Sequence, residues 1–152
     1  MKPFSLLLLL LLLPGCDIGI TVHDEDRAAE LTVDFLSALK SREGMPLSYD
    51  WTDDRYKKQV SFDDFSHIVA ALRDKNQGAD IGLDGYETFG STEAIVVYAS
   101  SGTASRKLYF KFVLVGTKTK DYYLLGLSID DSAFEKKGIY SDYPQSIVVK
   151  GV

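Results

Sequence analysis

The sequence predicts an α+β protein in which N-terminal helices precede an antiparallel sheet. Two spacings of the apolar residues indicate this: they recur every three or four positions across residues 24–76, and every second position across residues 81–129. Only short turn-forming segments separate the predicted strands, so neighbouring strands are expected to pair antiparallel. The 152 residues, of which 45% are hydrophobic and 26% charged, suit one folded domain.

The first predicted helix begins at Asp24, whose side chain can cap the backbone N–H groups of the first turn. Glu25 and Asp26 interact favourably with the positive end of the helix dipole. Gly44 and Pro46 predict the end of this helix. Its single apolar stripe consists of Ala28, Leu31, Phe35 and Leu39.

Two further helices are predicted, a short one within residues 53–58 and a longer one that starts after Ser61. Ser61 and Asp64 have the spacing of a capping box, in which the two residues at a helix start bond to each other's backbone. The longer helix is expected to end at residues 76–78, Asn-Gln-Gly. Its apolar stripe consists of Phe62, Phe65, Val69 and Leu72.

Alternating apolar residues predict strands at residues 81–89, 93–99, 104–115 and 122–129. Residues 100–103 and 116–121 are predicted turns. Beyond residue 131 the alternation weakens, and residues 146–150 either add a strand or pack on the surface. One face of the longest strand consists of Leu108, Phe110, Phe112 and Leu114.

Residues 1–15 have the pattern of a secretory signal peptide, in which Lys2 precedes eight consecutive leucines and the helix-breaking pair Pro14-Gly15. The apolar run is about half the ~20 residues that a membrane-spanning helix needs, so we expect no permanent transmembrane anchor. A run of identical leucines also lacks the polar face of a helix that packs on a folded domain.

The segment LPGC at residues 13–16 resembles the lipobox of bacterial lipoproteins. The resemblance implies cleavage before Cys16, a lipid on its thiol and acylation of its amine. Cys16 is the only cysteine, so its alternatives are a reactive thiol or an intermolecular disulfide. Asp17 resembles the residue that retains enteric lipoproteins at the inner membrane, which favours the periplasmic side of that membrane over the outer membrane.

After cleavage, residues 16–23 are expected to form the lipidated cysteine and a short tether, and residues 24–152 the single domain. Residues 1–15 contain one charged residue, Lys2. Residues 16–152 therefore have 16 basic and 22 acidic residues, a formal charge of −6. Nucleic-acid binding needs a basic stripe, so we expect no nucleic-acid partner. A domain of this length can bury a core without disulfides.

Three segments resemble the NTF2-like (cystatin-like) superfamily, which includes small exported lipoproteins: FLSALK at residues 35–40, VSFDDF at 60–65 and LGLSID at 125–130. The resemblance runs from about residue 30 to residue 129. It implies a strongly curved sheet wrapped on a long N-terminal helix, forming a cone with a pocket. It also implies homodimers that pair through their sheets.

The sequence lacks the motifs of catalysis and metal binding. It has no paired cysteines, His-x-x-x-His pair, EF-hand loop, nucleophile elbow or phosphate loop, so we expect no metal, no cofactor and no catalytic residue. Enzymes of the NTF2-like superfamily use a pocket carboxylate, often with Tyr or His. The residues here that match this set are Asp50, His67, Tyr98 and Tyr109.

A group of aromatic residues, Tyr49, Trp51 and Tyr56, is expected in one loop. These residues either pack at the edge of the core or form a surface that contacts a protein or peptide. The predicted function is a lipid-anchored envelope binding module without catalytic activity, which uses the pocket or a face of the sheet. The alternatives are a small-molecule enzyme of the isomerase or dehydratase type and an accessory subunit of an envelope complex. The expected partners are the membrane, a second copy of the chain, and an envelope protein or small apolar ligand.

Overall fold

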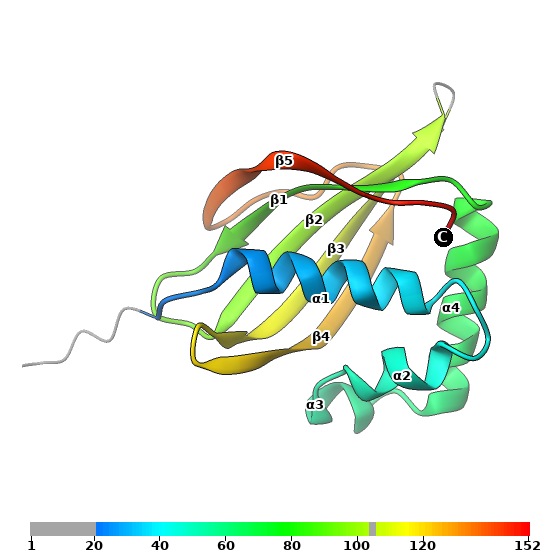
Figure 1. Cartoon of the computed structure of the whole chain (residues 1–152), viewed down its shortest axis with the longest axis horizontal. Helices are drawn as coiled ribbons and strands as arrows, with labels where there is room; N and C mark the ends of the chain where they lie inside the picture. The colour runs from blue at the N-terminus through cyan, green and yellow to red at the C-terminus, as the bar shows by residue number, and fades with distance from the viewer. Residues whose placement is uncertain (1–20, 104–105) are drawn as a thin grey trace, which may run out of the picture.

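The computed structural model describes residues 21–103 and 106–152, which fold as the predicted α+β class (Figure 1). The predicted signal peptide, residues 1–15, and Cys16 lie outside the described residues. The elements of the described part are α1 (Glu25–Ala38), α2 (Met45–Asp50), α3 (Asp54–Lys57), α4 (Phe62–Asn76), β1 (Ile81–Thr88), β2 (Ala94–Thr103), β3 (Arg106–Thr117), β4 (Lys120–Asp130) and β5 (Ile139–Val149).

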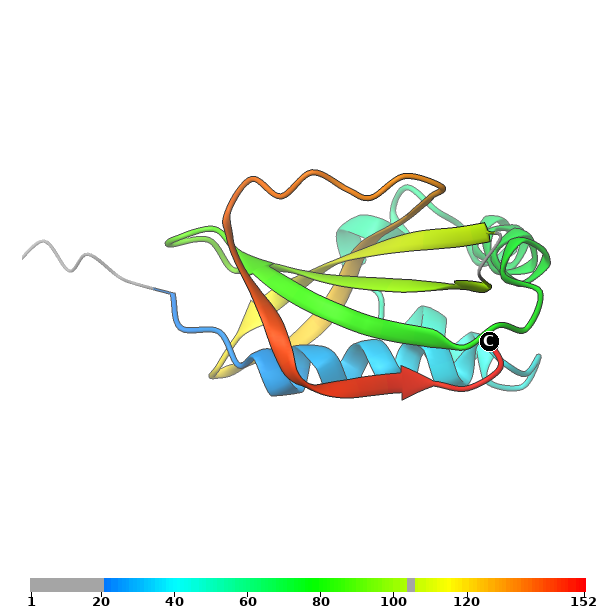
Figure 2. The same cartoon turned by 90° about the horizontal axis from the view of Figure 1, so that it is seen from above.

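The strands form one curved, unclosed antiparallel sheet in the order β4-β3-β2-β1-β5. Strands β1 to β4 follow one another as hairpins, whereas β5 pairs with β1 at the opposite edge from β4. The chain between β4 and β5, which we call the crossover segment (residues 131–138), therefore has to cross the whole sheet. Figure 2 shows this segment on one side of the sheet and α1 on the other.

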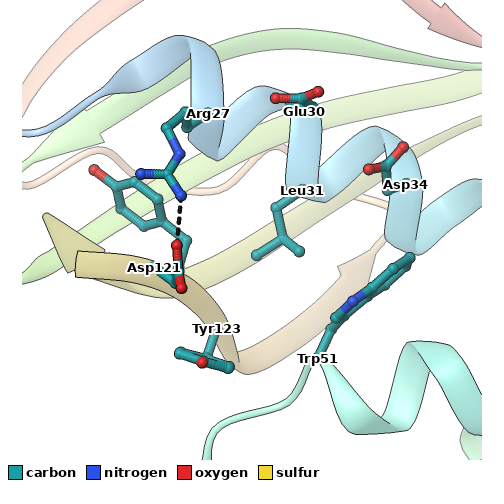
Figure 3. Close-up of a pocket in the computed structure, with 8 residues that line it drawn as sticks. Arg27, Glu30, Leu31, Asp34, Trp51, Asp121 and Tyr123 are labelled. Carbon is teal, nitrogen blue, oxygen red and sulfur yellow. Dashed lines mark hydrogen bonds and ion pairs between the residues drawn. The ribbon is translucent and has the colours of Figure 1, made fainter. Parts of the chain in front are cut away.

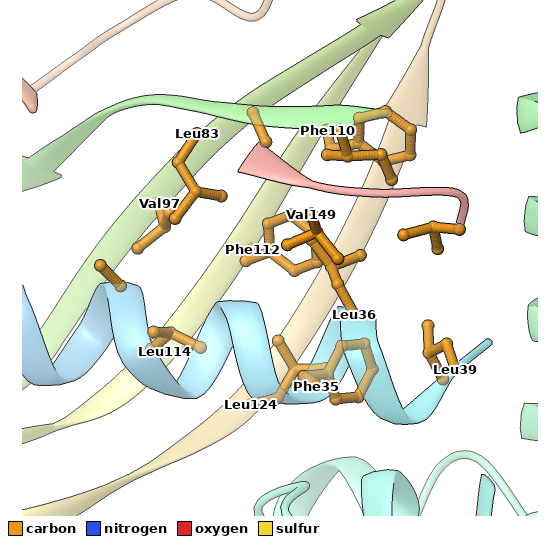
Figure 4. Packing of buried hydrophobic residues seen from close by; sticks show 14 of the residues in the cluster. Phe35, Leu36, Leu39, Leu83, Val97, Phe110, Phe112, Leu114, Leu124 and Val149 are labelled. Carbon is orange, nitrogen blue, oxygen red and sulfur yellow. The ribbon is translucent and has the colours of Figure 1, made fainter. Parts of the chain in front are cut away.

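The hydrophobic core lies between α1 and the inner face of the sheet (Figure 4). Phe35 of α1 packs edge-on against Phe112 of β3, with ring centroids 6.3 Å apart, and against Phe65 of α4 at 6.2 Å. The predicted apolar face of β3 is confirmed, since Leu108, Phe110, Phe112 and Leu114 are all buried. Burial of such side chains contributes roughly 1.5–3 kcal/mol each, which holds the helices on the sheet.

The two predicted helix caps are confirmed. The Asp24 carboxylate accepts a hydrogen bond from the Arg27 backbone N–H at 3.1 Å, and the Ser61 hydroxyl accepts one from Asp64 N–H at 3.2 Å. Phe62, by contrast, is wrongly predicted as buried. It occupies the first position of α4, remains 39% exposed and packs edge-on against Tyr49, with ring centroids 5.4 Å apart.

The segment around Tyr49 differs from its prediction as a loop, because residues 45–50 form helix α2. Pro46, predicted to end the preceding helix, lies in the first turn of α2, where its missing N–H group costs no hydrogen bond. Helix α1 had already ended at Ala38, before this proline.

The predicted turn at residues 100–103 is also wrong, because β2 continues through Thr103. Pairing with β3, Ser100 opposite Tyr109 and Gly102 opposite Lys107, overrides the local turn preference of this Ser- and Gly-containing segment. At the C-terminus, residues 146–149, for which a strand was one of two expectations, belong to the longer β5, which pairs with β1.

Candidate functional site

A groove of about 360 Å³ lies between α1 and β4 and is closed at one end by the residue that follows α2 (Figure 3). Leu31 projects from α1 toward β4 and forms part of the groove wall. The lining residues are Arg27, Glu30, Leu31, Asp34, Trp51, Asp121, Tyr122 and Tyr123. We call this feature the α1–β4 groove.

Trp51, the only tryptophan of the chain, is fixed in the groove by backbone pairing with β4. The Leu124 N–H donates to the Trp51 carbonyl at 2.9 Å, and the Asp53 N–H donates to the Leu124 carbonyl at 2.8 Å. Thr52 thereby forms a parallel bridge to Leu124 and is itself buried. These bonds hold the indole beside the strand that carries Tyr123, so the aromatic wall of the groove is built into the sheet edge.

The charged residues of the groove are unevenly paired. The Arg27 guanidinium forms an ion pair with the Asp121 carboxylate at 2.5 Å, and both side chains are accessible to solvent, Asp121 more than Arg27. Glu30 and Asp34 lie four residues apart, on one face of α1. Within residues 21–103 and 106–152, neither of their carboxylates forms an ion pair. The groove therefore carries two carboxylates with no ion-pair partner within 4 Å among the described residues, and one guanidinium, that of Arg27, which is paired with Asp121.

This arrangement has the chemistry of a site for a positive charge. The face of an indole or phenol ring attracts a guanidinium or ammonium group, with about 0.5–1 kcal/mol at exposed sites. Each carboxylate adds a Coulomb attraction of about 1 kcal/mol at 4 Å in water, and more where the groove excludes solvent. The lining residues include no serine, cysteine or histidine side chain. Its groups can bind and orient a cationic side chain.

Of the three aromatic residues predicted as an interaction surface, Trp51 lines the groove and the other two pack against the core. Tyr49 and Tyr56 lie with ring centroids 5.3 Å and 6.5 Å from that of Phe65. The Tyr49 hydroxyl donates to the Val60 carbonyl at 2.8 Å. Burial raises the pKa of Tyr56 above its usual value, with a smaller contribution from Tyr49. The sequence did not single out Tyr123, Glu30 or Asp34.

The four residues matched to an enzyme pocket are spread over the molecule. Asp50 is exposed at the end of α2, and His67 is exposed on α4. Tyr98 and Tyr109 share the outer face of the sheet, where Tyr98 is buried and Lys107 lies over the Tyr109 ring at 5.1 Å. The structure therefore brings only the two tyrosines to one surface.

Tyr98 has a buried carboxylate partner, Glu87 of β1. Its hydroxyl donates to Glu87 at 2.5 Å, and Glu87 is 1% exposed. The Glu87 carboxylate also accepts hydrogen bonds from the backbone N–H groups of Lys137 and Gly138, in the crossover segment. Burial, and then the bond to Glu87, raise the pKa of Tyr98 far above its usual value. The hydroxyl is therefore a donor at any physiological pH.

The crossover segment is also held to the sheet by cation–π contacts. Lys136 lies over the rings of Tyr98 and Tyr140, at 5.1 Å and 4.7 Å, and Lys111 lies over Phe134 at 5.0 Å. With three donors already bound to its oxygens, Glu87 acts as a clamp for the segment that covers it. An acid–base pair in an enzyme pocket would instead need access to a substrate.

The residues that precede α1 are docked on the domain, although the whole of residues 16–23 was predicted as a tether. The Thr21 hydroxyl donates to the Ser91 carbonyl at 2.8 Å, and His23 Nε2 lies 3.1 Å from the Thr92 carbonyl. Between these two residues, the Val22 carbonyl accepts the Lys118 N–H at 2.9 Å. Thr21, Val22 and His23 are thus tied to the β1–β2 loop and the β3–β4 turn.

Comparisons with known proteins do not identify the chain: no family model, curated protein or solved structure matches it. Among the described residues, no group of three or more His, Cys, Asp or Glu side chains is placed to hold a metal ion. The helices of residues 21–103 and 106–152 include none that is long and apolar enough to cross a membrane.

Proposed function

We propose that the protein is a lipid-anchored, non-catalytic binding module of the bacterial envelope, attached through Cys16 on the periplasmic side of the inner membrane. Its binding site is the α1–β4 groove, and its ligand is a Lys or Arg side chain of a partner envelope protein. The observation that carries this proposal is the combination of the Trp51 wall with the unneutralised carboxylates of Glu30 and Asp34.

An NTF2-like fold is part of the same proposal. The packing of an N-terminal helix on one face of a curved, unclosed antiparallel sheet supports it. The proposed site, however, lies beside α1 at the β4 edge, which differs from the central cone pocket that the resemblance implies.

The lipid anchor is tested by the variant Cys16→Ser, expressed in a Gram-negative host with the full chain. We expect the wild-type protein to be processed, to carry the mass of an acylated cysteine and to sediment with membranes. The variant should stay unprocessed. Processing of Cys16→Ser with unchanged membrane attachment would show that the anchor is wrong.

The groove is tested by isothermal titration of residues 21–152 with tri-arginine amide, using a tri-glutamate peptide as the control ligand. Two exposed ion pairs at about 0.7 kcal/mol each imply that Glu30→Gln/Asp34→Asn binds about tenfold more weakly. The matched variant Asp74→Asn/Glu135→Gln removes the same charge from exposed positions outside the groove and should bind like the wild type. If both double variants bound tri-arginine amide equally weakly, the loss of affinity would come from the net charge alone, and the groove would not be the binding site.

A further inference from the structure

The four residues at the start of the described chain are fastened to one end of the sheet. Besides the bonds of Thr21, Val22 and His23, the Asp24 N–H donates to the Tyr122 hydroxyl at 2.8 Å. The acceptors and donors on the domain come from the β1–β2 loop, the β3–β4 turn and the start of β4. In Figure 1 the chain enters the domain at this end, while α4 and the C-terminus lie at the opposite end. We call the first end the loop end.

These bonds shorten the chain that can separate Cys16 from the domain. Five Cα–Cα steps join Cys16 to Thr21, and an extended chain spans at most roughly 3.3–3.6 Å per residue, so the separation cannot exceed about 18 Å. Strand β3, with 12 residues, is about 40 Å long at ~3.3 Å per residue. The tether is thus less than half the length of the sheet, and the domain cannot turn its other end toward the bilayer while residues 21–24 stay docked.

We infer that the loop end of the domain lies against the lipid headgroups, with the β1–β2 loop and the β3–β4 turn as the contacting segments. This inference rests on the anchor of the proposed function. The surface facing this end is the lipid bilayer, because only the short chain before Thr21 separates the loop end from the acylated Cys16. The chemistry of the loop end fits polar headgroups: Ser91, Thr92 and Thr119 are exposed there, and Lys120 is paired with Glu93.

The orientation gives the α1–β4 groove a defined direction. Arg27 and Asp121 mark the groove end nearer the loop end, and Asp34 of α1 and Trp51 mark the far end (Figure 3). The groove therefore opens beside the domain and leads away from the bilayer. A partner must approach it from the side, as the juxtamembrane segment of a neighbouring envelope protein would.

The orientation is tested with single-cysteine variants of the full-length, acylated protein in phosphatidylethanolamine–phosphatidylglycerol vesicles. Cys16 is the only native cysteine and its thiol is consumed by the lipid, so an introduced cysteine alone reacts with an environment-sensitive fluorophore. Ser91→Cys and Lys118→Cys place the probe at the loop end, and Asp74→Cys places it in the last turn of α4. We expect a nitroxide-headgroup lipid to quench the first two probes at least threefold more than the third.

The outcomes separate the inference from the anchor on which it depends. Protein that does not float with the vesicles would overturn the anchor. Protein that floats, but whose three probes are quenched equally or whose Asp74→Cys probe is quenched most, would overturn the orientation alone. Inserting 12 Gly/Ser residues between Cys16 and Asp17 provides the control, because a flexible linker adds about 20 Å of mean reach. It should keep flotation and remove the difference in quenching.

Discussion

At the scale of single residues, Glu30 and Asp34 are better explained by binding than by stability. Like charges at positions i and i+4 of a helix repel, at a cost of roughly 0.2–0.5 kcal/mol for each pair. Asp26 lies four residues before Glu30 and extends the same acidic face of α1. If this face of α1 only had to be soluble, acidic and basic residues in alternation would serve as well and would also stabilise the helix.

The variant Glu30→Gln/Asp34→Asn should therefore be slightly more stable than the wild type, although it binds cations less well. Removal of the repulsion along α1 predicts a gain of about 0.3–0.6 kcal/mol in the free energy of unfolding. Urea titration followed by circular dichroism measures it. A loss of 1 kcal/mol or more would mean that these carboxylates form stabilising contacts in the folded protein. That result would contradict their lack of ion pairs among the described residues.

Glu87 has the opposite role, since its carboxylate satisfies three donors from distant parts of the chain. Glu87→Ala would leave the Tyr98 hydroxyl and the N–H groups of Lys137 and Gly138 without this acceptor. With hydrogen bonds to charged groups at about 1.5–3 kcal/mol each, we expect a loss of about 3 kcal/mol or more.

Hydrogen exchange of the Lys137 and Gly138 amides distinguishes release of the crossover segment from general destabilisation. In Glu87→Ala these amides should exchange far faster than the strand amides of β2 and β3. Glu135→Ala, an exposed glutamate on the same segment, is the control and should change neither quantity. Slow exchange of both amides in Glu87→Ala would contradict the clamp.

At the scale of elements, local chemistry explains what the sequence predicted and long-range pairing explains what it missed. The starts of α1 and α4 depend on Asp24 and Ser61, which bond to atoms three residues away. The alternation of apolar and polar residues along β3 identified its buried face because that pattern is also local in the sequence. The Leu83–Gly85 register shift, by contrast, is a property of β1 with both its neighbours, and it places Glu87 beneath a segment fifty residues later.

The groove was missed because no local pattern reports it. Trp51 was singled out as one aromatic residue among three, but its position depends on pairing with Leu124. Glu30 and Asp34 appear in the sequence only as the polar face of a helix. Their distance from Trp51 and Tyr123 is fixed by how α1 crosses the sheet, which residue spacing does not encode.

Helix α3 begins at an ion pair that is lost when its carboxylate is protonated at low pH. Its N-cap, Asp53, forms an ion pair with Arg55 Nε at 2.7 Å and also accepts the Arg55 backbone N–H. The hydrogen bond from the Arg55 side chain is the largest cause that holds the Asp53 pKa below its ordinary value of 3.8. The folded protein thus binds this proton less readily than the unfolded chain.

The stability that Asp53 contributes should be fully present above about pH 4 and lost as the pH falls through its lowered pKa. Asp53→Asn is accordingly expected to be less stable than the wild type at pH 7 and to approach it near pH 2.5. Urea midpoints at the two pH values measure this difference. Asp54→Asn serves as the control for the charge change. A gap between Asp53→Asn and wild type that widens in acid would contradict the direction of the pKa shift.

At the scale of the whole molecule, the acidic chain suits a cationic partner more than an anionic one. Residues 16–152 carry a formal charge of −6, and electrostatic attraction over the whole surface would accelerate the approach of a basic segment. With the proposed anchor at Cys16, the bonds of residues 21–24 would hold the groove close beside the bilayer. The proposed anchor, orientation and groove would together hold a basic segment of a partner close to a membrane.

The most direct measurement of the groove's role uses Trp51, the single tryptophan, as its own reporter. Indole emission of residues 21–152 is recorded during titration with tri-arginine amide, at 20 mM and 300 mM NaCl. We predict a saturable change at low salt, about tenfold weaker affinity in Glu30→Gln/Asp34→Asn, and loss of most of the affinity at high salt, where charges are screened within a few ångströms. Unchanged emission, or an equal response of the wild type and this variant, would contradict a cation-binding groove.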